Sequence, residues 1–116
     1  MDQPLITVGS SWHDGILLVT VVGEVDMDTV PKIRAALHQP APAVVLDLDG
    51  VTFFGSAGMQ LLVDTRNRVP GLAVVATDHP VLRPLEVTGL RPHLPLCPTR
   101  AAALAHVRDD LRSRTG

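Results

Sequence analysis

The segment at residues 44–59 constrains the fold of this chain more than any other part of its sequence. Apolar residues dominate positions 44–48, a glycine stands at position 55, and apolar residues return after Ser56 at helical spacing. This order is typical of a buried strand that leads through a tight turn into a helix. We therefore predict Ser56 as the N-cap of that helix, with an exposed hydroxyl beside backbone N–H groups that favour phosphate.

Predicted strands and helices alternate along the rest of the chain. Residues 5–8 and 15–22 flank a turn at residues 13–15 and predict a hairpin. Asp28 or Thr29 is expected to cap a first helix, with Pro31 in its first turn. Further strands are predicted at 43–48, 72–76 and 94–97. Three further helices are predicted. The first spans 57–69, the second is a brief helix that ends at Thr88 with Gly89 as its C′ residue, and the third follows its cap at Thr99.

Apolar residues repeat at helical spacing in three of these helices. The repeats are Val30, Ile33, Ala36 and Leu37 in the first helix, Met59, Leu62 and Val63 on one face of the second, and Ala101, Leu104, Val107 and Leu111 in the last. Pro84 fits the brief third helix only within its first turn. The alternation predicts a single α/β domain with a mixed sheet at residues 4–112, followed by a frayed tail at 113–116.

Composition excludes several classes of function. The net charge is −2, basic residues are scattered, and only Trp12, Phe53 and Phe54 are aromatic, so no direct binding to DNA or RNA is expected. The longest apolar run is far shorter than the roughly 20 residues of a membrane helix, and the N-terminus lacks a secretory pattern, so we expect a cytoplasmic protein. Cys97 is expected to act as a small buried hydrophobe. No metal or cofactor site is expected, because potential ligands lack suitable spacing.

Three motifs in this sequence resemble those of STAS domains in bacterial anti-sigma factor antagonists, also called anti-anti-sigma factors. They are Gly23-Glu-Val-Asp26, the segment that ends in Phe53-Phe-Gly-Ser-Ala-Gly-Met59, and Val87-Thr-Gly-Leu90. The resemblance covers nearly the whole chain and implies four or five strands with about four helices packed mainly on one side. In the family, the central motif has an aspartate before the serine and a leucine after the glycine. Gly55 and Met59 replace these residues here.

The resemblance implies a function in partner switching. The unmodified protein would bind an anti-sigma factor that is also a serine kinase, and thereby free a sigma factor. Phosphorylation of Ser56, the implied phosphoacceptor, would end this binding, and a serine phosphatase would restore it. The implied partner-binding residues are Asp26, Gly55, Ser56, Ala57, Gly58 and Met59. The implied activity is binding and not catalysis, with no membrane partner.

The residues themselves leave alternatives open at this site. Ser56 is explained by capping alone or by a cap that is also modified. Asp26 and Asp28 also fit turn and capping chemistry. Gly55 indicates either a positive φ angle that sharpens the turn or the loss of an acidic contact used by a kinase. Gly58 indicates close approach by a partner or by a neighbouring strand.

Three other functions remain open from the sequence. A STAS domain without phosphorylation would be a scaffold subunit of a sensory or lipid-transport assembly. A small serine hydrolase would use Ser56 as its nucleophile, but Phe54 occupies the first glycine position of the nucleophile-elbow motif. The chain also leaves little room for the loops of a catalytic triad. A role in binding a small ligand or nucleotide is the third alternative.

Overall fold

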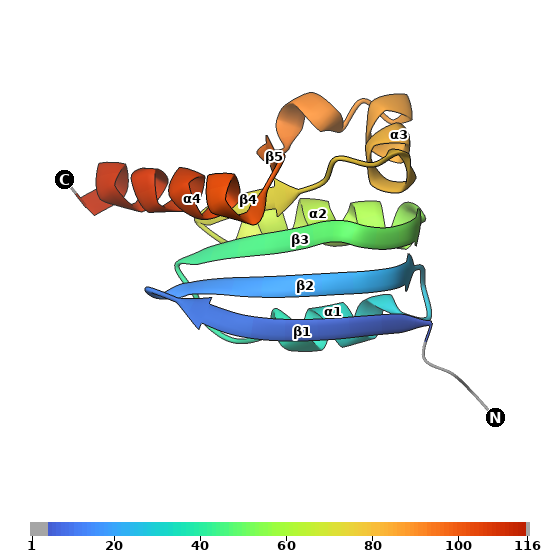
Figure 1. The fold of residues 1–116 in the computed structure, drawn as a ribbon, viewed down its shortest axis with the longest axis horizontal. Helices are drawn as coiled ribbons and strands as arrows, with labels where there is room; N and C mark the ends of the chain where they lie inside the picture. The colour runs from blue at the N-terminus through green and yellow to red at the C-terminus, as the bar shows by residue number, and fades with distance from the viewer. Residues whose placement is uncertain (1–4, 116) are drawn as a thin grey trace.

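The fold is a five-stranded mixed sheet with helices on both faces (Figure 1). The structure is a computed structural model that describes residues 5–115. Its elements are β1 (Ile6–His13), β2 (Ile16–Val25), α1 (Val30–Ala36), β3 (Ala43–Phe54), α2 (Ser56–Arg68), β4 (Gly71–Val75), α3 (His79–Val87), the 3₁₀ turn η1 (Arg91–His93), β5 (Leu96–Cys97) and α4 (Arg100–Thr115). The sheet order is β1–β2–β3–β4–β5, with β1 antiparallel to β2 and the other pairs parallel. The predicted α/β fold with a mixed sheet is confirmed.

The first two strands form the predicted hairpin. Asp14 and Gly15 occupy its turn with φ angles of 53° and 83°, the left-handed conformation that a type I′ turn requires. Further along β2, Gly23 has a φ of 117°, and a Cβ at this position would lie 2.2 Å from the carbonyl oxygen of Leu5. Only glycine fits where β2 passes the start of β1, just before the loop that carries Asp26.

Helices cover the two faces of the sheet unequally. Residues of α1, α2 and α3 pack on one face around a large core that includes Leu17, Leu46 and Leu62. On the other face, Ala103 and Val107 of α4 pack against a smaller core. In Figure 1, α4 crosses in front of the sheet while α1 and α2 lie behind it. The prediction that the helices pack mainly on one side is confirmed.

The buried residues of α2 extend beyond those predicted to share one face. Gly58, Leu61, Leu62 and Thr65 are its buried residues, whereas Met59 and Val63 are half-buried. Thr65 can lie in the core because its hydroxyl donates a hydrogen bond to the carbonyl of Leu61 at 2.7 Å. Its burial was not predicted because threonine is polar and the helical spacing was assigned from apolar residues alone.

The face of α4 that packs on the sheet includes most of the residues predicted at helical spacing. Val107 is fully buried, and Leu104 and Leu111 are partly buried against the same core. Ala101 is exposed, and Ala103 is buried instead. The side chain of Arg100 reaches the sheet, and Arg100, Ala103 and Val107 share one helix face by their spacing. The helix runs to Thr115, beyond the predicted domain end at residue 112.

Two backbone predictions need correction. β3 continues to Phe54 and does not end at position 48, because it stays paired with β2 through irregularities in the register beside Gly50. Pro84 lies inside α3 and not in its first turn. The missing N–H of this proline is tolerated because Val81 and Leu85 are buried and hold the short helix against the core.

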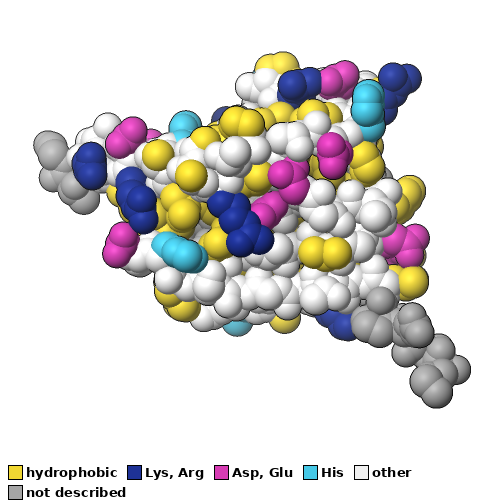
Figure 2. Space-filling model, in the orientation of Figure 1, with side chains coloured by type: hydrophobic (Ala, Val, Ile, Leu, Met, Phe, Trp, Pro, Cys, Tyr) yellow, Lys and Arg dark blue, Asp and Glu magenta, His cyan; other side chains and the backbone are white. Residues whose placement is uncertain are grey.

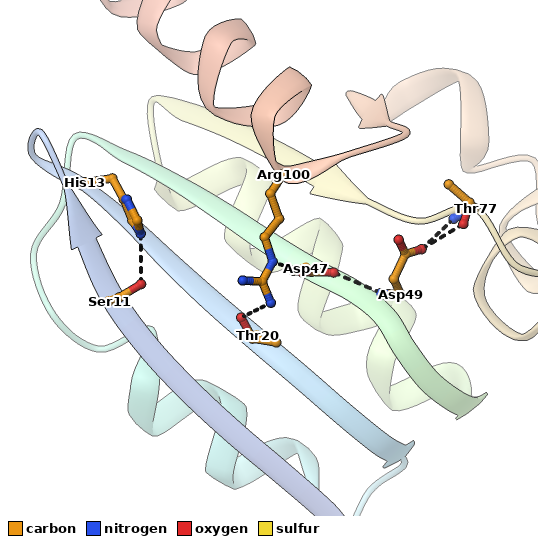
Figure 3. Close-up of polar contacts among 7 residues, drawn as sticks. All are labelled: Ser11, His13, Thr20, Asp47, Asp49, Thr77 and Arg100. Carbon is orange, nitrogen blue, oxygen red and sulfur yellow. Dashed lines mark hydrogen bonds and ion pairs between the residues drawn. The ribbon is translucent and has the colours of Figure 1, made fainter.

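A polar network fixes the start of α4 on the sheet (Figure 3). The buried carboxylate of Asp47 forms an ion pair with Arg100, and its other oxygen accepts the backbone N–H of Asp49 at 3.1 Å. The guanidinium of Arg100 also donates to the hydroxyl of Thr20 at 3.2 Å. Asp49 in turn accepts the backbone N–H and the hydroxyl of Thr77, both at 2.9 Å. The network therefore joins α4 to β2, β3 and the segment after β4.

The face of the molecule that carries α4 has mixed charge. In Figure 2, basic, acidic and histidine side chains are interspersed over this face, with apolar atoms between them. A nucleic-acid surface needs basic side chains gathered together, and this face does not offer such a patch. Within residues 5–115, no helix is both long enough and apolar enough to cross a bilayer.

Replacing Asp47 tests how much this network stabilises the fold. Asp47→Ala is expected to lower the free energy of unfolding by about 2 kcal/mol, because Arg100 and the N–H of Asp49 both lose their acceptor. Asp47→Asn should cost less, since the amide oxygen can still accept the N–H of Asp49. Urea unfolding of the three proteins makes the comparison. Equal losses in both variants would mean that the hydrogen bond to Asp49 contributes nothing.

Candidate functional site

The predicted site residues lie at one end of the sheet, where β2 and β3 both finish. These strands are parallel, and Val25 pairs with Phe54 at their last positions. The N–H of Gly55 donates to the Val25 carbonyl at 3.0 Å, so the loop that carries Asp26 begins beside the start of α2. Ligands of open α/β sheets commonly bind beyond the carboxyl ends of the strands. The structure therefore brings Asp26 and Ser56 to the same end of the fold.

Thr29, one of the two residues predicted to cap the first helix, is the N-cap residue of α1, but it makes no side-chain bond to the helix. Asp26 instead holds the turn that leads into α1. Its Oδ1 atom accepts the backbone N–H groups of Asp28 at 2.9 Å and of Thr29 at 3.0 Å. The hydroxyl of Thr29 accepts the N–H of Asp26 at 2.9 Å and donates to the Glu24 carbonyl at 2.7 Å. This reciprocal exchange resembles a capping box. Asp26 thus has the turn chemistry that the sequence left open, and its role as a contact residue stays a prediction.

Gly55, and not Ser56, is the N-cap of α2. Its backbone is extended, with a φ of −91° and a ψ of −173°, so the predicted positive φ is wrong. The ring of Phe53 disfavours a side chain here, because a Cβ on Gly55 would lie 3.1 Å from one ring carbon. The carbonyl of Gly55 accepts the N–H groups of Gly58 at 3.0 Å and Met59 at 3.2 Å. The glycine therefore makes room for an aromatic ring.

Ser56 is the first residue of a 13-residue helix, and its side chain is exposed. Within residues 5–115 its hydroxyl makes no hydrogen bond, so the predicted capping bond is absent. The first backbone N–H groups of a helix have no acceptor within the helix and give its start a partial positive charge. A phosphoryl group on this hydroxyl would lie where negative charge is tolerated.

Gly58 sets how closely α2 approaches the sheet. A Cβ on this residue would lie 2.7 Å from the ring of Phe54 and 2.9 Å from Cγ1 of Val25, and both side chains are buried. Of the two explanations that the sequence offered for Gly58, close approach to neighbouring strands is confirmed. The start of α2, and with it Ser56, is consequently held against the ends of β2 and β3.

Three large apolar side chains near these residues are exposed. They are Met27 with 80% of its surface exposed, Phe53 with 51% and Val87 with 73%. Met27 follows Asp26, Phe53 is the next-to-last residue of β3, and Val87 ends α3. Next to Val87, the hydroxyl of Thr88 contacts the sulfur of Met59 at 3.6 Å, which joins the end of α3 to the first turn of α2. Exposed apolar side chains around a polar site are typical of a protein-binding surface.

Sequence reasoning omitted these three residues from the candidate site. Met27 stands between two aspartates in a loop. An apolar residue in that polar setting, outside the predicted strand and helix, could have indicated an exposed side chain in the site. Phe53 and Phe54 are adjacent in a strand and point to opposite faces, so the sequence could have separated their roles. The exposure of Val87 depends on how α3 is rotated, which the sequence did not determine.

Charged and titratable groups elsewhere have structural explanations. Arg34 of α1 and Asp64 of α2 form an ion pair at 3.0 Å, and hydrogen bonds from Gln60 and Arg34 hold the pKa of Asp64 below its usual value. Cys97 is half-buried in β5 beside the α4 core, and burial raises the pKa of its thiol. In the part of the chain that the structure describes, no cluster of side chains could hold a metal ion.

Comparison with known proteins identifies the family of this chain. The family model for the STAS domain matches residues 11–103. The chain is 31% identical over 110 residues to the anti-sigma-F factor antagonist RsfB of Mycobacterium tuberculosis, a match that covers 89% of this chain and 90% of that protein. The chain therefore belongs to the STAS domain family.

Solved structures agree with this assignment. An anti-sigma factor antagonist from Mycobacterium paratuberculosis is 39% identical, with a TM-score of 0.81 over 89% of this chain and 94% of that chain. The unphosphorylated form of the anti-sigma factor antagonist SpoIIAA has a TM-score of 0.73 at 19% identity, over 89% of this chain and 97% of that one. At that identity, the second likeness shows the fold alone.

Substitutions at Asp26 separate its hydrogen bonds from its charge. Asp26→Ala is expected to lower the free energy of unfolding by about 1–2 kcal/mol, because two N–H groups at the start of α1 lose their acceptor. Asp26→Asn should keep most of that stability, since its amide oxygen can accept both bonds. Chemical denaturation measures both changes. If Asn and Ala destabilise equally, the turn geometry described here is not what stabilises the loop.

Proposed function

We propose that this protein is an anti-sigma factor antagonist that acts by partner switching. In its unphosphorylated form it binds an anti-sigma factor and thereby frees a sigma factor. Phosphorylation of Ser56 ends the binding. Two similar proteins that each align over 89% of this chain carry that name, which supports the proposal. The observation that carries it is the exposed Ser56 hydroxyl at the start of α2, beside the loop of Asp26.

The proposed binding surface combines polar and apolar groups at the ends of β2 and β3. It includes the predicted residues Asp26, Gly55, Ser56, Ala57 and Met59, to which we add Met27, Phe53 and Val87 because of their exposure. Gly58 is buried and would act through packing and not through contact. Exposed apolar side chains would supply most of the area that leaves water on binding, and the hydroxyl of Ser56 would lie among them.

The chemistry of Ser56 supports a charge-based switch. Phosphorylation would add a charge of about −1.5 to −2 to a side chain that is neutral and uncapped. In the free protein this charge would lie near the N–H groups at the start of α2. In a packed interface it would lose its hydration and meet the partner's surface without a prepared counter-charge. The modification would therefore destabilise the complex far more than the free protein.

Other proteins would supply the phosphoryl chemistry in this proposal. The donor would be an anti-sigma factor with serine kinase activity, a serine phosphatase would reverse the step, and the cycle would run in the cytoplasm. The same fold is known in SpoIIAA in both an unphosphorylated and a phosphorylated form. Within residues 5–115 the hydroxyl of Ser56 makes no hydrogen bond to a histidine base, which favours binding over the hydrolase alternative.

Substitutions at Ser56 test the proposed switch. Ser56→Asp should weaken binding to a candidate anti-sigma kinase from the same genome about tenfold or more, because it places a charge in the interface. Ser56→Ala should bind like the unmodified protein and lose little stability, since the serine hydroxyl forms no capping bond. Calorimetric titration measures both affinities. Equal affinities for the two variants would contradict the charge mechanism.

Mass measurement tests the modification itself. Incubation with ATP and the same kinase should add one phosphate to the intact protein and none to Ser56→Ala. If a complex forms but no mass is added, the protein is instead a STAS scaffold without phosphorylation, the alternative that Gly55 favours by replacing the aspartate of the family motif. If no complex forms with any anti-sigma factor of that genome, the proposed function itself is wrong.

A further inference from the structure

β1 leaves one edge of the sheet open. It is the first strand in the sheet order, and among the described residues it pairs with β2 only. In Figure 1 this strand forms the lower margin of the sheet. Proteins usually protect such an edge with proline or charged side chains that prevent another strand from pairing. Residues 6–12 contain neither, so this edge is available to a further strand.

The hairpin register shows which main-chain groups face the open edge. The N–H of Glu24 donates to the carbonyl of Leu5 at 2.9 Å, so the main chain of Leu5 bonds toward β2. In an antiparallel pair, such residues alternate with residues whose N–H and C=O groups point away from the partner strand. The outward set in β1 is therefore Ile6, Val8, Ser10 and Trp12.

The side chains of this outward set lie on the sheet face that α1 covers. Ile6 and Val8 pack against the large core, and Trp12 pairs across the hairpin with the core residue Leu17. A largely apolar groove between the strand edge and α1 is lined by Ile6, Thr7, Val8, Lys32, Ala35 and Ala36. Trp12 lies at the opposite end of β1, and half of its surface is exposed.

We propose that a second copy of this chain pairs its β1 with this edge in the antiparallel direction. Ile6 of each copy then faces Trp12 of the other, and Val8 faces Ser10. All outward main-chain groups find partners in this register, whereas a shift in either direction leaves some unpaired. The result is one continuous sheet across both copies, with a twofold axis at Gly9.

This register also matches the side chains of the two copies. Trp12 of each copy lies over the other's groove, where its ring covers Ile6 and Ala35 and faces the ammonium of Lys32. In each copy, α1 flanks only the half of β1 that begins at Ile6. In the dimer, the α1 of one copy therefore lies beside the half of the other copy's β1 that has no helix next to it, and the two α1 helices do not collide. Because groove and ring belong to the same chain, a second copy fits better than a foreign peptide.

Sedimentation velocity over a concentration series, combined with fluorescence, tests this interface. Trp12 is the only tryptophan of the chain, so its emission reports the contact directly. We expect a concentration-dependent dimer whose formation moves the emission to shorter wavelength. Ser10→Pro should raise the dissociation constant about tenfold or more, because proline removes an outward N–H and leaves the bonds to β2 in place.

A matched pair of variants and an exchange measurement complete the test. Trp12→Ala should weaken the dimer, whereas Phe53→Ala, which removes an aromatic side chain of similar exposure outside the edge, should leave it unchanged. Amide hydrogen exchange should show protection of Ile6, Val8, Ser10 and Trp12 only at concentrations where the dimer forms. A protein that stays monomeric throughout the series, or a dimer that both Ser10→Pro and Trp12→Ala leave intact, overturns the proposal.

Discussion

The parallel pairing of β2 with β3 is the interaction on which the candidate site depends. It continues to the last residues of both strands, Val25 and Phe54, and therefore starts the Asp26 loop and α2 at the same level of the sheet. Asp26 then holds the turn before α1, and Gly58 lets α2 pack closely on the two strand ends. If the pairing ended earlier, the two loops would be positioned independently, and their residues would not form one surface.

Much of the fold could be predicted from local signals. The turn at Asp14 and Gly15, the apolar run that begins β3 and the cap at Thr99 each depend on a few neighbouring residues. The placement of Ser56 at an exposed helix start also follows from the local sequence, because a glycine precedes it and apolar residues follow at helical spacing. Signals of this kind determine which elements form and in which order they occur.

What the sequence did not reveal depends on contacts between elements. Thr29 is the N-cap residue of α1, as one of the two predicted candidates, but the sequence did not reveal that the carboxylate of Asp26 accepts two N–H groups in the turn before the helix. The backbone of Gly55 is extended and needs no positive φ, and the ring of Phe53 lies close to where a side chain would stand. The buried face of α4 includes Ala103 and Val107, and the ion pair between Arg100 and Asp47, residues far apart in the sequence, joins the start of the helix to the sheet. In each case the missing information was the position of a distant group.

The close packing at Gly58 has a consequence for any modification of Ser56. The start of α2 cannot move toward the sheet, because Phe54 and Val25 already fill that space. It is also joined to the end of α3 through Met59 and Thr88. A negative charge added at Ser56 would then alter the electrostatic field at the surface while the backbone stayed in place. Free and modified protein would share one conformation, and the difference in affinity would arise where the partner's side chains meet that field.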